Sequence, residues 1–271
     1  MAWPENNLRA DTDEHSLRLA VLIDADNAQA SVIEGLLAEI ARFGQASVKR
    51  IYGDFTSPNS AQWKKVLNQY AIKPVQQFAY TTGKNATDST MIIDAMDLLY
   101  TRRFDGFCLV SSDSDFTGLA LRIREEGLSV FGFGEEKTPD AFRNACHKFI
   151  FTEVLRPLPA PPAAVNATPA PEKQAPTQPL PVAPPKKALP LQFVLQALDQ
   201  ACDDNGWANL AAFGSYLTKL QSDFDPRLYG FKKLSDLVKS KSHVFMVEER
   251  PVPGGNSQVI YVRRKAAKAD Q

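Results

Sequence analysis

The sequence predicts an α/β fold, a parallel sheet sandwiched by helices, followed by a second, small winged helix-turn-helix domain. Three observations support this prediction. Short apolar or β-branched runs alternate with amphipathic stretches as far as residue 156. A segment rich in proline and alanine follows, and 12 of the 19 prolines lie between Pro157 and Pro190. Beyond it, three helical stretches precede two alternating segments that are typical of a β-hairpin.

The composition divides the chain into three parts. A length of 271 residues suits two domains better than one. We expect an α/β domain over residues 15–156 and a small domain over residues 189–264. The stretch between them, 157–188, has few large apolar side chains to bury, so it is predicted to be a flexible linker.

Five strands are predicted in the first domain, at 19–24, 48–52, 72–78, 107–111 and 128–133. The first is apolar almost throughout, which is typical of a strand buried on both faces. Pro74 interrupts the third and favours an edge position, because proline cannot donate a hydrogen bond to a neighbouring strand. Helical periodicity predicts the intervening helices, at 31–43, 60–70, 87–100, 116–126 and 140–146.

The second domain is predicted to contain three helices and a hairpin. Apolar residues recur at helical spacing in 191–202, in 210–220 and within 228–238. Two alternating segments then follow, at 243–248 and 258–263, and the proline- and glycine-rich stretch Pro251–Asn256 between them favours a hairpin turn. This order of elements is that of a winged helix.

Charge is balanced overall but not evenly distributed. The chain has 31 Lys and Arg against 31 Asp and Glu. Residues 1–156 carry 17 basic and 21 acidic side chains, a net of −4, whereas residues 191–271 carry 11 and 9, a net of +2. Four lysines of the second part are close in sequence: Lys232, Lys233, Lys239 and Lys241. Such a group is either a phosphate-binding surface or simply a solvated face.

Cysteine usage and hydropathy bear on location. The three cysteines, Cys108, Cys146 and Cys202, lie in apolar contexts without Cys-x-x-Cys spacing, which argues against a disulfide frame or a zinc site. No apolar run has the length needed to span a bilayer. We therefore expect a cytoplasmic protein without a membrane segment.

Three acidic residues lie at predicted element ends. Asp24 closes the first strand, Asp113 follows the fourth, and Asp88 begins the third helix. Each alone is an ordinary turn or helix-start residue. In a parallel sheet, however, the loops at the carboxyl ends of the strands share one crevice, so the three can converge. Crowded carboxylates repel each other unless a cation neutralises them, and oxygen ligands suit Mg²⁺ or Mn²⁺.

Two other phosphate chemistries have partial support in the sequence. The opening Asp24-Ala25-Asp26-Asn27-Ala28 is similar to that of haloacid dehalogenase-like phosphatases, in which Asp24 would be a nucleophile and Asp26 a general acid. Ala28 departs from that pattern, so this is the weaker alternative. The segment Gly83-Lys84-Asn85 lacks the upstream glycine and following Ser or Thr of a phosphate-binding P-loop.

Three separated segments, in order, resemble the NYN domain, a branch of the PIN-like ribonucleases: Asp24–Asn27, Gly83–Asp97 and Ser111–Phe116. The resemblance covers about residues 18–155. It implies a PIN-like fold and a metal-dependent endoribonuclease in which Asp24, Asp88 and Asp113 bind the metal while Asp115 and Asn27 support them. One departure is His147, at a position where the family often has an acid. It is either a surface residue or a weakened fourth ligand.

The segment Tyr229–Val238 resembles the OST-HTH or LOTUS domain, a winged helix-turn-helix found in RNA-linked proteins. This resemblance covers about residues 189–263 and implies RNA binding. Docking of a protein partner by this domain, and a non-catalytic RNA-binding or adaptor role for the whole chain, remain open alternatives. Candidate phosphate contacts are Lys84, Arg143, Lys232, Lys233, Lys239 and Lys241.

Overall fold

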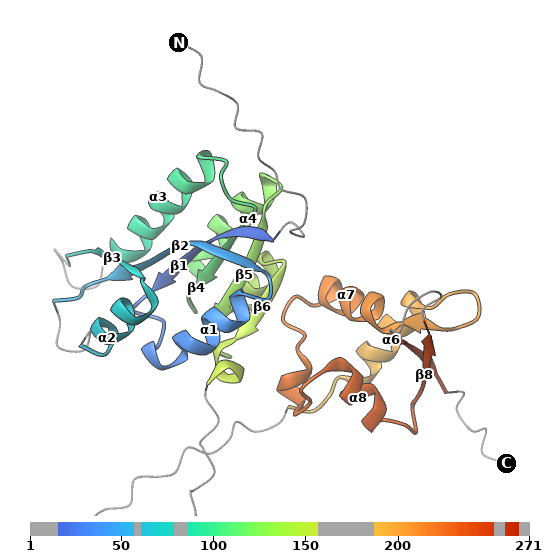
Figure 1. Ribbon diagram of the computed structural model, residues 1–271. Helices are drawn as coiled ribbons and strands as arrows, with labels where there is room; N and C mark the ends of the chain where they lie inside the picture. Colours follow the sequence, from blue (N-terminus) through green and yellow to red (C-terminus); the bar gives the residue numbers. More distant parts are fainter. Residues whose placement is uncertain (1–15, 57–60, 79–85, 157–186, 252–257, 266–271) are drawn as a thin grey trace, which may run out of the picture. The chain divides into compact units, whose positions relative to one another are not determined.

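The computed structural model describes residues 16–56, 61–78, 86–156, 187–251 and 258–265 (Figure 1). The chain divides into two compact units, Met1–Thr152 and Glu153–Gln271. Nearly all of the predicted linker and most of the hairpin turn lie outside the described residues.

The first unit is built on a six-stranded parallel sheet, in the order β3-β2-β1-β4-β5-β6. Its strands are β1 (Leu17–Asp24), β2 (Gly44–Gly53), β3 (Lys73–Gln76), β4 (Gly106–Val110), β5 (Ser129–Gly134) and β6 (Lys148–Phe151). The predicted α/β class and the parallel sheet are confirmed.

Strand position follows from composition. In β1 the last six residues are buried, and the strand lies between β2 and β4, as expected of a continuous apolar run. β3, which contains Pro74, lies at the edge, as predicted. β6 was not among the strands predicted from the pattern. It has only four residues and follows a helix closely, so hydrophobic periodicity does not separate it from the helix end.

Helices cover both faces of this sheet. They are α1 (Ile33–Ile40), α2 (Ala61–Tyr70), α3 (Ala86–Tyr100), α4 (Thr117–Glu125) and α5 (Asp140–Ala145). Figure 1 shows α1 and α2 on one face and α3 and α4 on the other. Short 3₁₀ turns precede two of them and follow β6: η1 (Ala30–Val32), η3 (Ser114–Phe116) and η4 (Thr152–Leu155).

The strand order creates a switch point. From β1 the chain first builds outward through β2 to β3, then crosses back to add β4, β5 and β6 on the other side of β1. Helical connections therefore leave the carboxyl ends of β1 and β4 in opposite directions, which opens a crevice between these two ends. Asp24 ends β1 and Ser111 follows β4, so this crevice receives the acidic residues singled out in the sequence.

The second unit packs three helices against a three-stranded antiparallel sheet of order β7-β9-β8. Its elements are α6 (Leu191–Ala201), β7 (Ala208–Asn209), α7 (Leu210–Leu220), η5 (Pro226–Tyr229), α8 (Leu234–Ser240), β8 (Phe245–Pro251) and β9 (Gln258–Arg264). The three helices and the hairpin were predicted. The two-residue β7 is too short to give a sequence signal.

The described helices are short or carry charged side chains. None of them is long and apolar enough to cross a membrane.

Candidate metal centre

Asp24 lies at the buried end of β1, with no solvent-exposed surface. Its Oδ1 accepts a hydrogen bond from the Asp26 backbone N–H (3.0 Å), and its Oδ2 accepts from Asn27 Nδ2 (2.8 Å) and Ser111 Oγ (2.7 Å). Burial raises the pKa of Asp24, and the three hydrogen bonds partly oppose that rise. A carboxylate has about four acceptor positions, so roughly one is left, on Oδ1.

Ser111 connects the ends of β1 and β4. Besides donating to Asp24, its Oγ accepts a hydrogen bond from the Asp113 backbone N–H at 3.1 Å. A Cβ atom at Gly134 would lie only 2.5 Å from the Ser111 carbonyl oxygen, so the glycine permits the close approach of β5 here. The sequence analysis assigned Ser111 no role. Its signal is its position, directly after a buried strand and two residues before Asp113.

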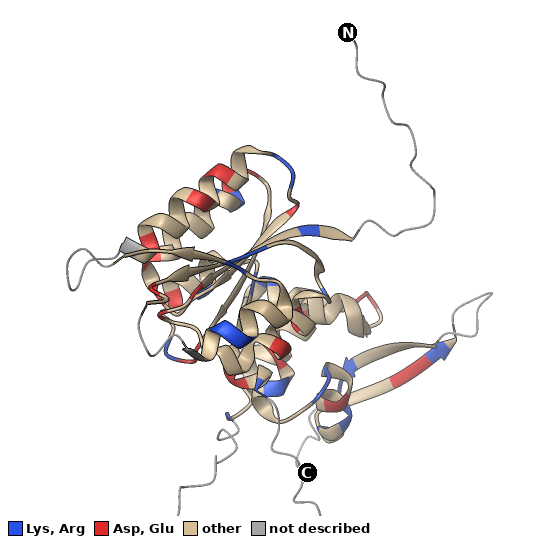
Figure 2. Ribbon diagram, turned by 60° about the vertical axis from the view of Figure 1, so that its left-hand side comes forward, with Lys and Arg blue, Asp and Glu red and all other residues tan. Residues whose placement is uncertain are grey.

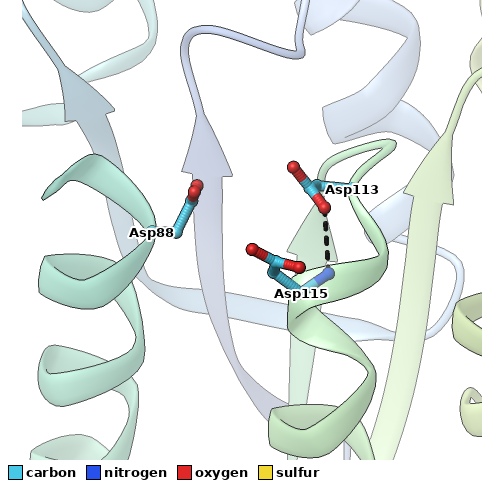
Figure 3. A group of neighbouring side chains, drawn as sticks. All are labelled: Asp88, Asp113 and Asp115. Carbon is cyan, nitrogen blue, oxygen red and sulfur yellow. Dashed lines mark hydrogen bonds between the residues drawn. The ribbon is translucent and has the colours of Figure 1, made fainter. Parts of the chain in front are cut away.

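Asp113 and Asp115 are placed by a local turn. Asp113 Oδ1 accepts a hydrogen bond from the Asp115 backbone N–H at 2.9 Å and thereby caps η3. Asp88 lies in the first turn of α3. One carboxylate oxygen from each of Asp88, Asp113 and Asp115 lies within 4.8 Å of the other two (Figure 3). We call these three residues the acidic trio.

The trio has a marked electrostatic signature. The pKa of Asp88 is raised to about 6, first by burial and then by the negative charges of Asp24, Asp113 and Asp115. Asp24 is thus close enough to act on Asp88 although it is not one of the trio. Carboxylate oxygens clustered around Asp88 in this way are a donor set that fits a hard divalent cation such as Mg²⁺ or Mn²⁺.

The structure brings five predicted residues to this crevice but arranges them differently from the sequence prediction. The sequence grouped Asp24 with Asp88 and Asp113 as ligands and gave Asp115 a supporting role. In the structure Asp115 is a member of the trio, whereas Asp24 lies beside it and is held by Asn27 and Ser111.

Two residues of the first domain, Lys84 and Arg143, were predicted as phosphate contacts. Lys84 lies outside the described residues. Arg143, on α5, forms an ion pair with Asp140, and its guanidinium carbon lies 5.6 Å from the centre of the Phe151 ring. These partners hold Arg143 against α5 and β6.

His147 is an exposed residue just before β6, at the amino end of that strand. Its Nδ1 accepts a hydrogen bond from the Val130 backbone N–H at 3.0 Å. In a parallel sheet the amino ends lie at the edge opposite the carboxyl ends, so His147 is far from the trio. The surface-residue interpretation is supported, and the fourth-ligand alternative is not.

Glu135 is an acid of this edge that the sequence analysis missed. It directly follows β5, and its backbone N–H donates to Ser112 Oγ at 2.8 Å. Gln29 Nε2 donates to Glu135 Oε1 at 3.1 Å, and Lys137 Nζ lies 2.9 Å from Oε2. The carboxylate of Glu135 is therefore already paired with Lys137 and Gln29.

The four lysines of the second unit differ in setting. Lys232 and Lys233 are exposed immediately before α8. Lys239 forms an ion pair with Glu249 (2.7 Å), and Lys241 is partly buried after the end of α8.

Comparisons with known proteins agree with the two-part organisation. A model of the NYN domain matches residues 18–155, and a model of the OST-HTH/LOTUS domain matches residues 185–256. A comparison with curated proteins gives no significant match.

Solved structures that resemble parts of the chain have no function in their descriptions. An uncharacterised protein of Nitrosomonas europaea is 50% identical, with 38% of this chain and 98% of that chain covered and a TM-score of 0.31. A protein of unknown function from Vibrio parahaemolyticus is 17% identical, with 52% of this chain and 95% of that chain covered and a TM-score of 0.44. A Chromobacterium violaceum protein fragment is 33% identical, with 32% of this chain and 91% of that chain covered and a TM-score of 0.25.

Proposed function

The chain belongs to the NYN domain family and carries an OST-HTH/LOTUS domain after it, and from this premise we propose that it is a divalent-metal-dependent endoribonuclease with a C-terminal RNA-binding module. The observation that carries the proposal is the acidic trio, whose oxygens meet within 4.8 Å at the switch point of the sheet. A family likeness alone would equally suit a protein that keeps the fold and has lost the chemistry.

The trio supplies what a divalent ion needs. We propose that Asp88, Asp113 and Asp115 hold Mg²⁺ or Mn²⁺, and that Asp24 contributes through its one remaining acceptor position on Oδ1. When bound, such an ion polarises a phosphoryl oxygen and lowers the pKa of a water molecule. The chain's own residues hold the ligands in place: Ser111 and Asn27 orient Asp24, and the η3 turn orients Asp113.

A phosphatase that uses Asp24 as a nucleophile is disfavoured. A nucleophilic carboxylate must reach the substrate, yet the Asp24 side chain has no exposed surface and already accepts three hydrogen bonds. The neighbouring trio is partly exposed. Both observations favour metal-assisted attack by water over a covalent intermediate.

The cleavage test uses the full chain with labelled unstructured and structured RNA, with Mn²⁺, with Mg²⁺ or with EDTA. We expect metal-dependent cleavage that Asp88→Asn and Asp24→Asn each abolish, because both changes remove charge and Asp24→Asn also replaces an oxygen that accepts hydrogen bonds. Asp97→Asn, an exposed aspartate later on the same helix, is the matched control and should cleave normally. Metal-independent RNA binding without cleavage would instead support the non-catalytic adaptor.

The module's lysines are proposed phosphate contacts. Because Lys232 and Lys233 are exposed and Lys239 is paired with Glu249, we expect the first two to contribute more. Changing both to Ala should weaken RNA binding and reduce its log–log salt dependence by roughly 0.7 for each phosphate that is no longer neutralised. The matched control, Lys239→Ala, should have the smaller effect. The reverse ranking would show that ion pairing does not decide which lysines meet RNA.

We also propose a reducing, cytoplasmic setting. Cys108, Cys146 and Cys202 are all unpaired. Burial raises the pKa of the Cys146 thiol to about 12, so this thiol stays protonated and unreactive.

A further inference from the structure

The three-stranded sheet of the second unit has two chemically different faces. Residues alternate along a strand, so Phe245 and Val247 of β8 and Ile260 and Val262 of β9 point together into the helical core. The intervening residues point to the other face: Met246, Glu248, Arg250, Val259, Tyr261 and Arg263. We call this the open face, because the described helices α6, α7 and α8 all pack against the core side. Figure 1 shows these helices on one side of β8.

An aromatic–arginine cluster lies on this open face. The Arg250 guanidinium carbon lies 4.4 Å from the centre of the Tyr261 ring and 4.9 Å from that of Trp207, which precedes β7. Both rings are partly exposed, and neither belongs to the hydrophobic core of the unit. Single exposed apolar side chains are ordinary, whereas aromatic rings grouped outside a core and bordered by polar residues mark a binding surface.

Trp207 is held in place by its own loop. Asp203 Oδ1 accepts hydrogen bonds from the backbone N–H groups of Asn205 (3.0 Å) and Trp207 (2.9 Å). Gly206 has a φ of +74°, and a Cβ atom there would lie 3.4 Å from Arg263 Nε, so Arg263 packs along this loop. The backbone that carries Trp207 is therefore ordered before any ligand arrives, and its ring already contacts Arg250, which reduces the entropy lost on binding.

The charges of the open face suit a polyanion. Arg250 and Arg263 are positive, and Glu248 is the one acid that alternation places among them, with Asp203 in the adjoining loop. Glu248 Oε2 lies 3.0 Å from Arg250 Nη2, so it orients the guanidinium over the rings. Figure 2 shows basic and acidic segments on the hairpin. Aromatic rings beside arginines form the surface on which unpaired bases stack while their phosphates meet positive charge.

From this arrangement we infer that the open face, through Trp207, Arg250 and Tyr261, binds unpaired bases of single-stranded RNA by stacking. The inference rests on the proposed function, because it adds a base-stacking surface to the phosphate contacts that are proposed for the module's lysines. It predicts a preference for unpaired over duplex RNA, since bases within a duplex are already stacked.

The test measures binding of a short fluorescent oligouridine to the full chain by polarisation, in EDTA so that no cleavage occurs. Tyr261→Ala and Trp207→Ala should each weaken binding by about fivefold or more, the value expected for loss of a stacked base. Tyr100→Ala, an exposed tyrosine on α3, is the matched control and should bind normally. Trp207→Phe, which keeps a ring, should restore most of the affinity.

A second probe needs no variant. An abasic ribose-phosphate chain of equal length keeps the charges and removes the rings, so it should bind the unaltered protein about fivefold or more weakly. Equal affinity for abasic and intact RNA, or normal binding by folded Tyr261→Ala and Trp207→Ala proteins, overturns the inference. Either result leaves metal-dependent cleavage and its loss in Asp88→Asn intact, so failure of the proposed function is recognised separately.

Discussion

The two sheets of this chain present side chains in opposite ways. The six-stranded parallel sheet is covered by helices on both faces, and its proposed chemistry lies at the edge where β1 and β4 end. The described helices cover the three-stranded antiparallel sheet on one face, and its proposed contacts lie on the other. The difference shows how sheet type determines where function can be built: a doubly covered sheet leaves its strand ends, whereas a singly covered sheet leaves a whole face.

The comparison is tested most strongly by removing one site at a time. Asp113→Asn should lower RNA cleavage by more than about 100-fold, because a metal ligand supplies several kcal/mol to the transition state. Its affinity for oligouridine should be unchanged, whereas Tyr261→Ala should show weakened binding and retained cleavage at saturating RNA. Cleavage rates and binding affinities are measured on both variants. If Asp113→Asn lost oligouridine binding as severely as cleavage, the two sites would not be separate and the comparison would fail.

Ser111→Ala sharpens the comparison within the acidic edge. Ser111 is not proposed to touch RNA, yet it holds both Asp24 and the Asp113 backbone. Its loss should reduce cleavage by about 10- to 100-fold, as for other partners that orient metal ligands. Ser111→Thr keeps the hydroxyl and should recover part of the rate. If Ser111 positions the metal ligands, the Mn²⁺ concentration that gives half-maximal cleavage should be higher in Ser111→Ala. A general loss of stability would not shift this concentration.

A pH series tests whether the trio is destabilising without metal. The pKa of Asp88 is about 6 in the folded chain against an ordinary value of 3.8, so the folded state binds more protons between these values. Stability in EDTA should therefore fall as pH rises from about 4 to about 6. Asp88→Asn removes this dependence, so relative to the parent it should gain about 1 kcal/mol at neutral pH, allowing for solvent screening.

Denaturant unfolding of the parent, Asp88→Asn and the control Asp97→Asn at about pH 4 and about pH 7 measures this difference. Added Mn²⁺ at neutral pH should stabilise the parent and have less effect on Asp88→Asn. If the free energy of unfolding changed with pH equally in the parent and Asp88→Asn, ionisation of Asp88 would not be what destabilises the metal-free site.

The smallest expected effect concerns the opposite edge of the sheet. His147→Ala should leave cleavage unchanged, because His147 lies at the amino end of β6. It should lower the free energy of unfolding by about 1 kcal/mol, since the Val130 N–H loses its acceptor. A large loss of cleavage in a stably folded His147→Ala protein would return this residue to the candidate ligands.

Local sequence patterns predict much of the fold but only part of the candidate site. The apolar run at β1 and the proline in β3 predicted a central and an edge strand, because burial and hydrogen bonding act on these residues directly. The convergence of Asp24, Asp88 and Asp113 followed from the geometry of parallel sheets. The sequence did not predict that Asp115, and not Asp24, would be the third member of the trio. The position of Asp24 depends on hydrogen bonds from Asn27 and Ser111, which come from neighbouring loops.

The open face escaped sequence analysis for a different reason. Arg250 and Tyr261 meet through the β8–β9 hairpin, but Trp207 lies far from them in the chain and joins them only when β7 pairs with β9. With two residues, β7 gives no sequence signal. Clustered lysines attract attention in a sequence because they are neighbours. A cluster assembled by strand pairing has no such local signal.

The short outer strands of the parallel sheet bear on how the protein behaves when concentrated. β3 and β6 have four residues each, and Pro74 removes a backbone N–H from β3 while the exposed Lys73 adds charge beside it. An edge of this kind is a poor template for a strand of another molecule. The apolar central strands of the parallel sheet are thus shielded from edge-to-edge association, and aggregation through this sheet should begin with its unfolding.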